Sequence, residues 1–253
     1  MPKDAKNPRL AIVSLTCCEG CQFAILDLGE KMVELFKNFE VVEFGLVQDE
    51  KNNKEYDFVL VEGTPITKEN FKKLELARKS AKTLIALGTC AHLGGIQQIK
   101  NYQDKEEKIK YVYKFPKGLD NPEIKPLSSF VKVDYVIPGC PITGSEFLRI
   151  MTELRNGITP KIPDRTVCYE CQIKGNPCLL QQAKPCFGPV ILGGCEAVCP
   201  SHGFPCYACR GPVSEPNLES LRQIFKEHGM EDKFEILMQE FGAADEVLSR
   251  NKK

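Results

Sequence analysis

Short apolar runs alternate with helical stretches over roughly the first 150 residues. The runs are rich in β-branched residues and have the length of buried strands, whereas the stretches between them carry apolar residues at helical spacing. This alternation is typical of an α/β fold with a parallel sheet covered by helices. Strands are predicted at 9–15, 41–46, 57–62, 83–87 and 133–137, and helices at 21–36, 68–80 and 144–156.

The pattern changes in two later segments. Residues 101–129 are polar, charged and interrupted by prolines, which predicts an insertion or a long surface loop. Residues 217–253 carry amphipathic helical periodicity and are predicted to close a second domain.

A domain boundary is predicted near residue 158. Gly157 can end the preceding helix, and Pro160 begins a linker. The chain is therefore expected to form a larger α/β domain, residues 1–158, and a smaller cysteine-rich domain, residues 159–253.

Charge and hydropathy exclude some classes of partner. The 34 basic and 34 acidic residues cancel, so no global field draws the chain to nucleic acid or to an anionic membrane. No run approaches the ~20 apolar residues that span a bilayer, which predicts no direct membrane insertion. The amino terminus shows no export signal, so a cytoplasmic location is expected.

The thirteen cysteines are the informative excess. Disulfides are rare in reducing compartments, so metal ligation is the first hypothesis. Intracellular disulfides of the kind that hyperthermophiles use are the alternative. Because the count is odd, at least one thiol is left over.

Five cysteines follow predicted strands. The carboxyl ends of parallel strands share one edge of the sheet, where ligands bind. These side chains are therefore expected to form one four-thiolate site, with one cysteine to spare. They are Cys17, Cys18 and Cys21 after the first strand, Cys90 after the fourth and Cys140 after the fifth.

Eight further cysteines separate by local spacing into two sets of four. Little periodic hydrophobicity accompanies them, so ligand bonds are expected to order this region. The second set is Cys168, Cys171, Cys178 and Cys186, and the third is Cys195, Cys199, Cys206 and Cys209. Four thiolates suit either zinc or an iron-sulfur cubane, but zinc ribbons more often pair two CxxC knuckles, and each set here has one.

The ordered series of motifs resembles the small subunit of [NiFe] hydrogenases. Single pieces such as CxxC are weak, but the series is specific, and it extends from the first strand to Pro212. The motifs are CxxC at Cys18, VEGTPI from Val61, GTCAHLGGI from Gly88, PGCPI from Pro138, CLLQQAKPCFGPV from Cys178 and PCYACRGP from Pro205.

This resemblance implies a flavodoxin-like first domain and three [4Fe-4S] clusters that conduct electrons. It implies a proximal cluster on Cys18, Cys21, Cys90 and Cys140. It implies a medial cluster on Cys195, Cys199, Cys206 and Cys209, and a distal cluster on Cys168, Cys171, Cys178 and Cys186. No flavin is predicted, because the cysteine motif occupies the usual phosphate-loop position.

Two departures from the periplasmic branch of that family point to its cytoplasmic, sulfhydrogenase-like and cofactor-coupled branch. Cys168 stands where the periplasmic branch commonly has histidine. Cys199 supplies a fourth medial thiol, whereas the periplasmic branch has three. Cys17 is adjacent to Cys18, and tandem cysteines both act as ligands in the related quinone-oxidoreductase subunit. We expect Cys18 to be the ligand, and Cys17 to be either a packing residue or a residue that contacts the ligands without binding the cluster.

Hydrogen activation is expected on a partner. The chain lacks the paired CxxC motifs that hold nickel and iron, so no catalytic residue is predicted on it. The expected partners are a [NiFe] large subunit and a further iron-sulfur or flavin acceptor subunit. The alternatives are a quinone-oxidoreductase-type small subunit, which needs no eight-cysteine tail, a zinc-stabilised interaction module and a free-standing ferredoxin-like carrier.

Overall fold

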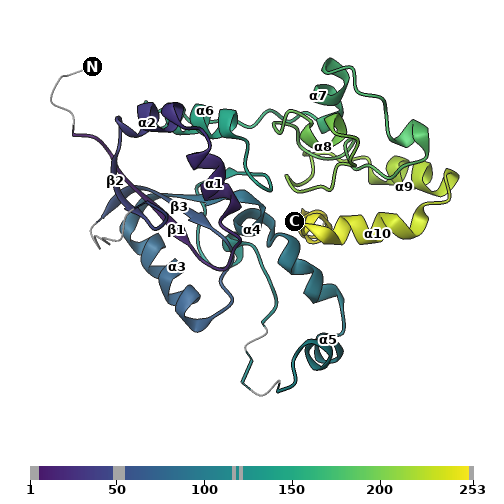
Figure 1. Cartoon of the computed structure of the whole chain (residues 1–253), viewed down its shortest axis with the longest axis horizontal. Helices are drawn as coiled ribbons and strands as arrows, with labels where there is room; N and C mark the ends of the chain where they lie inside the picture. Colours follow the sequence, from purple (N-terminus) through teal and green to yellow (C-terminus); the bar gives the residue numbers. More distant parts are fainter. Residues whose placement is uncertain (1–5, 48–54, 116–117, 120–121, 251–253) are drawn as a thin grey trace. The chain divides into compact units, whose positions relative to one another are not determined.

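The computed structural model describes residues 6–47, 55–115, 118–119 and 122–250. Within these residues, five parallel strands form one sheet in the order β2-β1-β3-β4-β5 (Figure 1). The strands are β1 (Arg9–Ser14), β2 (Glu40–Phe44), β3 (Tyr56–Glu62), β4 (Ala81–Leu87) and β5 (Tyr135–Ile137). All five predicted strands are confirmed, and the predicted and observed strands differ only in where they begin and end.

Strand β1 lies inside the sheet, between β2 and β3, and pairs in parallel with both. The strand order therefore reverses beside β1, as in flavodoxin-like sheets. In such sheets ligands bind beyond the carboxyl ends of the strands at this reversal.

The two faces of the sheet follow the alternation of side chains along β1. Leu10 and Ile12 pack on one face, and Ala11 and Val13 pack on the other. The first face is covered by α1 (Gly20–Leu26), α2 (Glu30–Phe36) and α6 (Gly144–Arg155), and the opposite face by α3 (Lys68–Ser80) (Figure 1).

The first helical region differs from its prediction. One helix was expected over 21–36, but α1 ends at Leu26 and α2 begins at Glu30. Gly29 adopts φ 55° and ψ −123° between them, a conformation that interrupts helical geometry and that glycine tolerates best. The helices expected at 68–80 and 144–156 are confirmed as α3 and α6.

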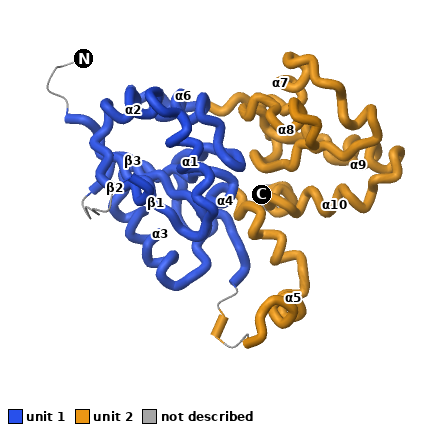
Figure 2. Tube along the Cα trace, in the orientation of Figure 1, with its two compact units in different colours: residues 1–92, 120–160 blue, residues 93–119, 161–253 orange. Residues whose placement is uncertain are grey.

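The chain divides into two compact units, shown in blue and orange in Figure 2. Unit 1 comprises residues 1–92 and 120–160, and unit 2 comprises 93–119 and 161–253. The division at residue 158 that the sequence suggests differs from this in assigning 93–119 to the first domain. Helix α4 (Gly88–Leu93) ends at the first crossing between the units.

The segment expected to be a loop at 101–129 contains helices. They are the 3-10 helix η1 (Ile96–Tyr102), α5 (Lys105–Val112) and the 3-10 helix η2 (Leu127–Ser129). Asp104 caps α5 by accepting hydrogen bonds from the N–H groups of Glu106 and Glu107, a local signal that the polar composition concealed. Residues 116–117 and 120–121 of this prediction lie outside the described residues.

Unit 2 surrounds an apolar core with short helices. Gly229 and Gly242, both at positive φ, divide the predicted helical tail into three helices. The last residues of that prediction, 251–253, lie outside the described part. Besides η1 and α5, the helices of this unit are α7 (Val167–Ile173), η3 (Leu180–Gln182), α8 (Val198–Ser201), α9 (Leu218–Glu227), α10 (Glu231–Glu240) and α11 (Ala243–Arg250).

Three aromatic rings mark the centre of this core. Phe187 packs against Phe225 and Phe234 with ring centroids 5.4 and 5.0 Å away. All three side chains are buried. Helices α9 and α10 are therefore fastened to the chain that immediately follows Cys186. No helix in the described ranges is long and apolar enough to cross a bilayer.

Candidate metal centres

The cysteines of unit 1 meet at the carboxyl edge of its sheet. Cys18 and Cys21 follow β1, Cys90 lies in α4 directly after β4, and Cys140 follows β5. The Cys90 thiol interacts electrostatically with Cys140 and Cys18, and the Cys21 thiol interacts with Cys140. The structure thus brings the predicted first set together. Cys17 also lies within electrostatic range of Cys90 and Cys18.

Two glycines leave space for these sulfur atoms. A Cβ atom on Gly88 would stand 2.3 Å from Cys21 Sγ, and one on Gly20 would stand 3.3 Å from Cys18 Sγ. Gly88 also has φ +78°, which favours glycine. Beside it, the Thr89 N–H donates to the Gly139 carbonyl at 2.9 Å, which ties the end of β4 to the loop before Cys140.

A buried polar network supports the Cys18–Cys21 turn. Glu62, at the end of β3, accepts hydrogen bonds from the Cys21 N–H at 3.1 Å and from Gln22 Nε2 at 2.9 Å. Gln22 Nε2 also donates to Ser14 Oγ at 2.7 Å. Gln22 was missed at the sequence level, because a glutamine in an amphipathic helix is usually exposed.

Burial raises the thiol pKa values at this edge. Burial and then the charge of Glu62 raise the pKa of Cys17 to about 12. Burial and then Cys140 raise the pKa of Cys90 to about 12. The pKa of Cys21 is also raised, by burial and then by Glu62. These thiols stay protonated at neutral pH without metal, so metal binding has to release their protons.

Cys17 is in a different position from its neighbour. Its Sγ donates to the Leu15 carbonyl at 3.7 Å, and the side chain is half-buried, whereas Cys18 is exposed. The contact with Leu15 is local and leaves the choice between Cys17 and Cys18 as a prediction.

The second set of cysteines converges within unit 2. Burial raises the pKa of the Cys168 thiol to about 12, together with the charges of Cys186, Cys171 and Cys178. Gly188 passes close to this group, because a Cβ there would stand 3.2 Å from Cys168 Sγ and 3.5 Å from Cys186 Sγ. All four predicted members of this set therefore lie near one another.

The third set also converges. Cys206 is buried, and burial, followed by the charges of Cys186, Cys209 and Cys195, raises its pKa well above the ordinary value. The thiol of Cys199, in α8, interacts electrostatically with Cys195.

The backbone is bent around two sulfurs of this set. Backbone hydrogen bonds from Ala197 and Ala208 reach Cys195 and Cys206. Both alanines have positive φ, 49° and 66°, a strained conformation for any residue except glycine. Such bends turn N–H groups toward an anionic centre.

Cys186 lies where the second and third sets adjoin. The Cys206 N–H donates to Cys186 Sγ at 3.4 Å, and the Phe187 N–H donates to the Cys206 carbonyl at 3.1 Å. Asn176 makes a second link, because its Nδ2 donates to Cys171 Sγ at 3.6 Å and to Ser201 Oγ at 2.9 Å. The spacing of the cysteines along the sequence did not predict either of these hydrogen-bonded links.

The donor chemistry fits iron-sulfur clusters. Each set offers four thiols with glycine-lined or N–H-lined surroundings, as cubane ligation requires. Across the described ranges, no group of three or more His, Cys, Asp or Glu side chains is placed to hold a single metal ion. A [4Fe-4S] cluster distributes its four cysteines over four irons, so its ligands stand farther apart than those of one ion.

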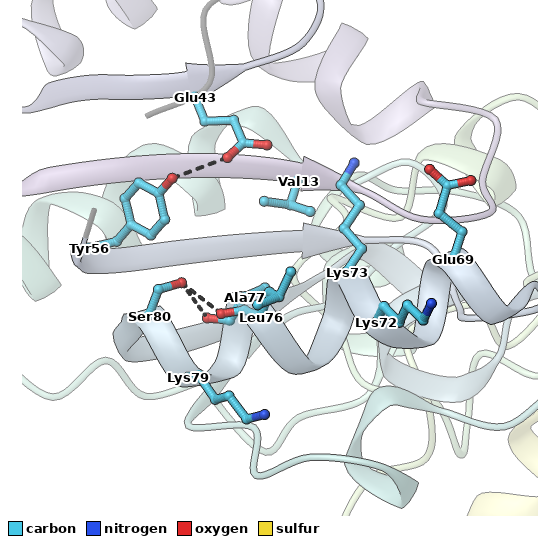
Figure 3. Close-up of a pocket in the computed structure, with 10 residues that line it drawn as sticks. All are labelled: Val13, Glu43, Tyr56, Glu69, Lys72, Lys73, Leu76, Ala77, Lys79 and Ser80. Atoms are coloured by element: carbon cyan, nitrogen blue, oxygen red, sulfur yellow. Dashed lines mark hydrogen bonds between the residues drawn. The ribbon is translucent and has the colours of Figure 1, made fainter. Parts of the chain in front are cut away.

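A cavity of about 520 Å³ lies between α3 and the sheet in unit 1 (Figure 3). At one end Tyr56 donates to Glu43 at 3.2 Å. Along its wall Lys73 Nζ donates to the Ser14 carbonyl at 2.8 Å. Ser14 also contacts Gln22, so a hydrogen-bonded chain joins this wall to the network beneath the first cysteine set.

Residues 18–154 match the family described as NADH ubiquinone oxidoreductase, 20 Kd subunit. The match contains the four predicted ligands of unit 1. The chain therefore belongs to this family.

The relatives define its branch. The chain is 38% identical over 223 residues to the delta subunit of sulfhydrogenase 2 of Pyrococcus furiosus, covering 87% of this chain and 92% of the relative. It is 35% identical to a subunit of the vhu F420-non-reducing hydrogenase of Methanocaldococcus jannaschii, covering 82% of this chain and 83% of the relative. Within the family, the chain is thus a hydrogenase small subunit.

A solved structure agrees. A chain of the NAD+-reducing [NiFe]-hydrogenase in the H2-reduced state superposes with a TM-score of 0.56 at 27% identity. The superposition covers 62% of this chain and 96% of that one.

Proposed function

We propose that this chain relays single electrons between the hydrogen-activating site of a [NiFe] large subunit and an acceptor subunit, through three [4Fe-4S] clusters. The observation that carries this proposal is the grouping of twelve cysteines into three sets of four, one in unit 1 and two in unit 2. The ligands would be those expected from the sequence: Cys18, Cys21, Cys90 and Cys140; Cys195, Cys199, Cys206 and Cys209; and Cys168, Cys171, Cys178 and Cys186.

A bound cluster supplies reversible one-electron redox chemistry, at a potential set by charge, hydrogen bonds and exposure. The chain's own residues prepare for this. Gly88 and Gly188 admit the sulfur atoms, while the N–H of Cys206 and the amide of Asn176 donate to Cys186 and Cys171. The contact between Cys186 and Cys206 provides a short hydrogen-bonded connection between the two clusters of unit 2.

The named relatives belong to sulfhydrogenase and F420-non-reducing hydrogenase. By analogy, a large subunit would activate hydrogen, and an iron-sulfur or flavin subunit would exchange electrons with the relay. A cytoplasmic location remains part of the proposal. A quinone-oxidoreductase role would use the first set alone, and the eight convergent cysteines of unit 2 argue against it. A zinc-stabilised module would contain zinc in place of iron, so metal analysis distinguishes it from the proposed relay.

The proposal is tested by anaerobic purification of the native complex through a tag on this chain. We expect about twelve irons per chain, broad visible absorption, a nickel-containing partner and hydrogen-dependent dye reduction. Stoichiometric zinc with negligible iron would contradict the cluster proposal. Full iron without a nickel partner would favour a free-standing carrier.

The distal role is tested separately with Cys186→Ala. Hydrogen activation on the partner, followed by isotope exchange between H2 and solvent, should continue, while electron delivery to the acceptor slows at least about tenfold. Cys17→Ala is the matched control, since we expect it to keep both activities. Unchanged acceptor reduction with a full iron content in Cys186→Ala would contradict the distal assignment.

A further inference from the structure

Arg210 is completely buried, although it carries a permanent positive charge. It follows Cys209 directly in the chain and lies in unit 2. Removing a guanidinium group from water costs several kcal/mol unless the protein compensates it. A charge kept at such a place therefore calls for a role beyond packing.

The guanidinium holds the segment that leads to Cys195. Arg210 Nε donates to the Gly193 carbonyl at 2.9 Å and to the Leu192 carbonyl at 3.2 Å. The Leu192 N–H also donates to the Gly211 carbonyl at 3.0 Å, so a backbone hydrogen bond next to Arg210 joins the same two chain segments. Arg210 thus connects the last cysteine of the third set to the first.

A carboxylate binds an N–H group of the same segment. Glu170, which is largely buried in α7, accepts a hydrogen bond from the Gly194 N–H at 2.6 Å and another from Arg165 Nη2 at 3.3 Å. The approach is close, because a Cβ on Gly193 would stand 3.2 Å from Glu170 Oε1. The two opposite charges therefore lie against the same peptide group, the one that joins Gly193 to Gly194, just before Cys195.

Both charges act on the Cys195 sulfur. The charges of Arg210 and Glu170 both lie within electrostatic range of the Cys195 sulfur, and they act on it with opposite signs. The field of Arg210 at the third cysteine set is therefore favourable to negative charge.

We propose that Arg210 is a positioning residue that raises the reduction potential of the cluster held by Cys195, Cys199, Cys206 and Cys209. This inference rests on the proposed function, because it assumes that a cluster occupies this set. Reduction adds one negative charge to the cluster, and a fixed positive charge nearby stabilises the reduced form more than the oxidised form. Burial strengthens the effect, because water does not screen the interaction.

The test is a redox titration of the anaerobically purified complex, followed by electron paramagnetic resonance. In Arg210→Gln, one cluster should become harder to reduce, its one-electron equilibrium constant falling at least about tenfold, or about 59 mV. Arg210→Lys keeps the charge and should restore most of the potential. Arg222→Gln is the control, because Arg222 is a partly exposed cation that pairs with Glu235 in the same unit.

The outcomes separate the two proposals. A wild-type chain without iron would overturn the proposed function itself. A wild-type chain with a full iron content and potentials that are equal in Arg210→Gln and Arg222→Gln would overturn only the role of Arg210. An equal loss of potential in Arg210→Lys and Arg210→Gln would also overturn it, since geometry rather than charge would then be responsible.

If Arg210→Gln fails to retain iron, Glu170→Gln tests the same field with the opposite sign. Neutralising Glu170 should make the cluster easier to reduce by a similar factor. No shift, or a shift toward harder reduction, would overturn the electrostatic account.

Discussion

The carboxylate of Glu62 accepts a hydrogen bond from the backbone N–H of Cys21 at 3.1 Å, and both residues are buried. In Glu62→Ala, this N–H loses its acceptor, and the Gln22 amide loses one of its two acceptors and keeps Ser14 Oγ. We expect the free energy of unfolding to fall by about 1–3 kcal/mol for each unsatisfied donor. We also expect a lower iron content. Glu62→Gln keeps one acceptor oxygen, so its stability should lie between those of the wild type and Glu62→Ala.

Denaturant unfolding and iron analysis of the three proteins provide the measurement. Glu69→Ala, at an exposed position in the first turn of α3, is the control. If Glu62→Ala were as stable as Glu69→Ala, the buried network would have no structural role.

The close approach of Gly88 to Cys21 gives a second prediction. In Gly88→Ala, the new Cβ would meet Cys21 Sγ at 2.3 Å, so we expect about four of twelve irons to be lost from unit 1. Gly157→Ala is a matched control, because it also has positive φ, +71°, but its Cβ would have nothing within 4 Å. Similar iron contents in the two variants would mean that backbone strain, rather than crowding at sulfur, explains any effect.

The adjacent cysteines Cys17 and Cys18 can be separated in the same way. Cys18→Ala should lose about four irons per chain, whereas Cys17→Ala should keep about twelve. Iron and acid-labile sulfide analysis measures both. The reverse result would make Cys17 the ligand of the first set.

Asp134 provides a prediction about pH. Burial alone would raise its pKa, but the Leu84 N–H and the side chains of Arg78 and Lys132 together lower it. Arg78 Nη1 lies 2.6 Å from Asp134 Oδ2. A lowered folded-state pKa means that the ionised carboxylate stabilises the fold above the unfolded value of about 3.9. This contribution is lost as the pH falls through the folded pKa.

Asp134→Asn should therefore lower the free energy of unfolding at pH 7 by about 1–3 kcal/mol. The difference from wild type should shrink below about pH 4. Thermal unfolding between pH 3 and 7 measures this. A difference that is constant over the whole range would show that charge is not responsible.

The aromatic core of unit 2 gives the last prediction. Phe187→Ala should destabilise this unit by about 3–5 kcal/mol, because a fully buried ring leaves a cavity beside Cys186. Phe204→Ala, at a side chain that is 60% exposed, should change stability by less than about 0.5 kcal/mol. Circular dichroism on heating compares them, and equal melting temperatures would contradict the packing argument.

The sheet and the cysteine sets could be predicted because their signals are local or topological. Strand β1 shows as an apolar run, and Cys90 and Cys140 are brought to one edge by the parallel topology. The break between α1 and α2 was missed, since Gly29 looks like a tolerated glycine until its backbone conformation is known.

Buried polar partners could not be predicted. Gln22, Glu170 and Arg210 are residue types that are usually exposed, and their burial depends on chain segments that are remote in sequence. The link between Cys186 and the Cys206 N–H likewise depends on the path of the backbone rather than on spacing. The grouping of residues 93–119 with unit 2 also depends on tertiary contacts that the local sequence does not show.

The packing of Phe187 on Phe225 and Phe234 has a consequence for biosynthesis. The ring beside Cys186 gains its apolar cover from α9 and α10, which are translated after all eight cysteines of unit 2. The cysteine sets of unit 2 therefore acquire their sheltered surroundings only after translation of these helices. The first set, complete by Cys140, is translated before any of these helices.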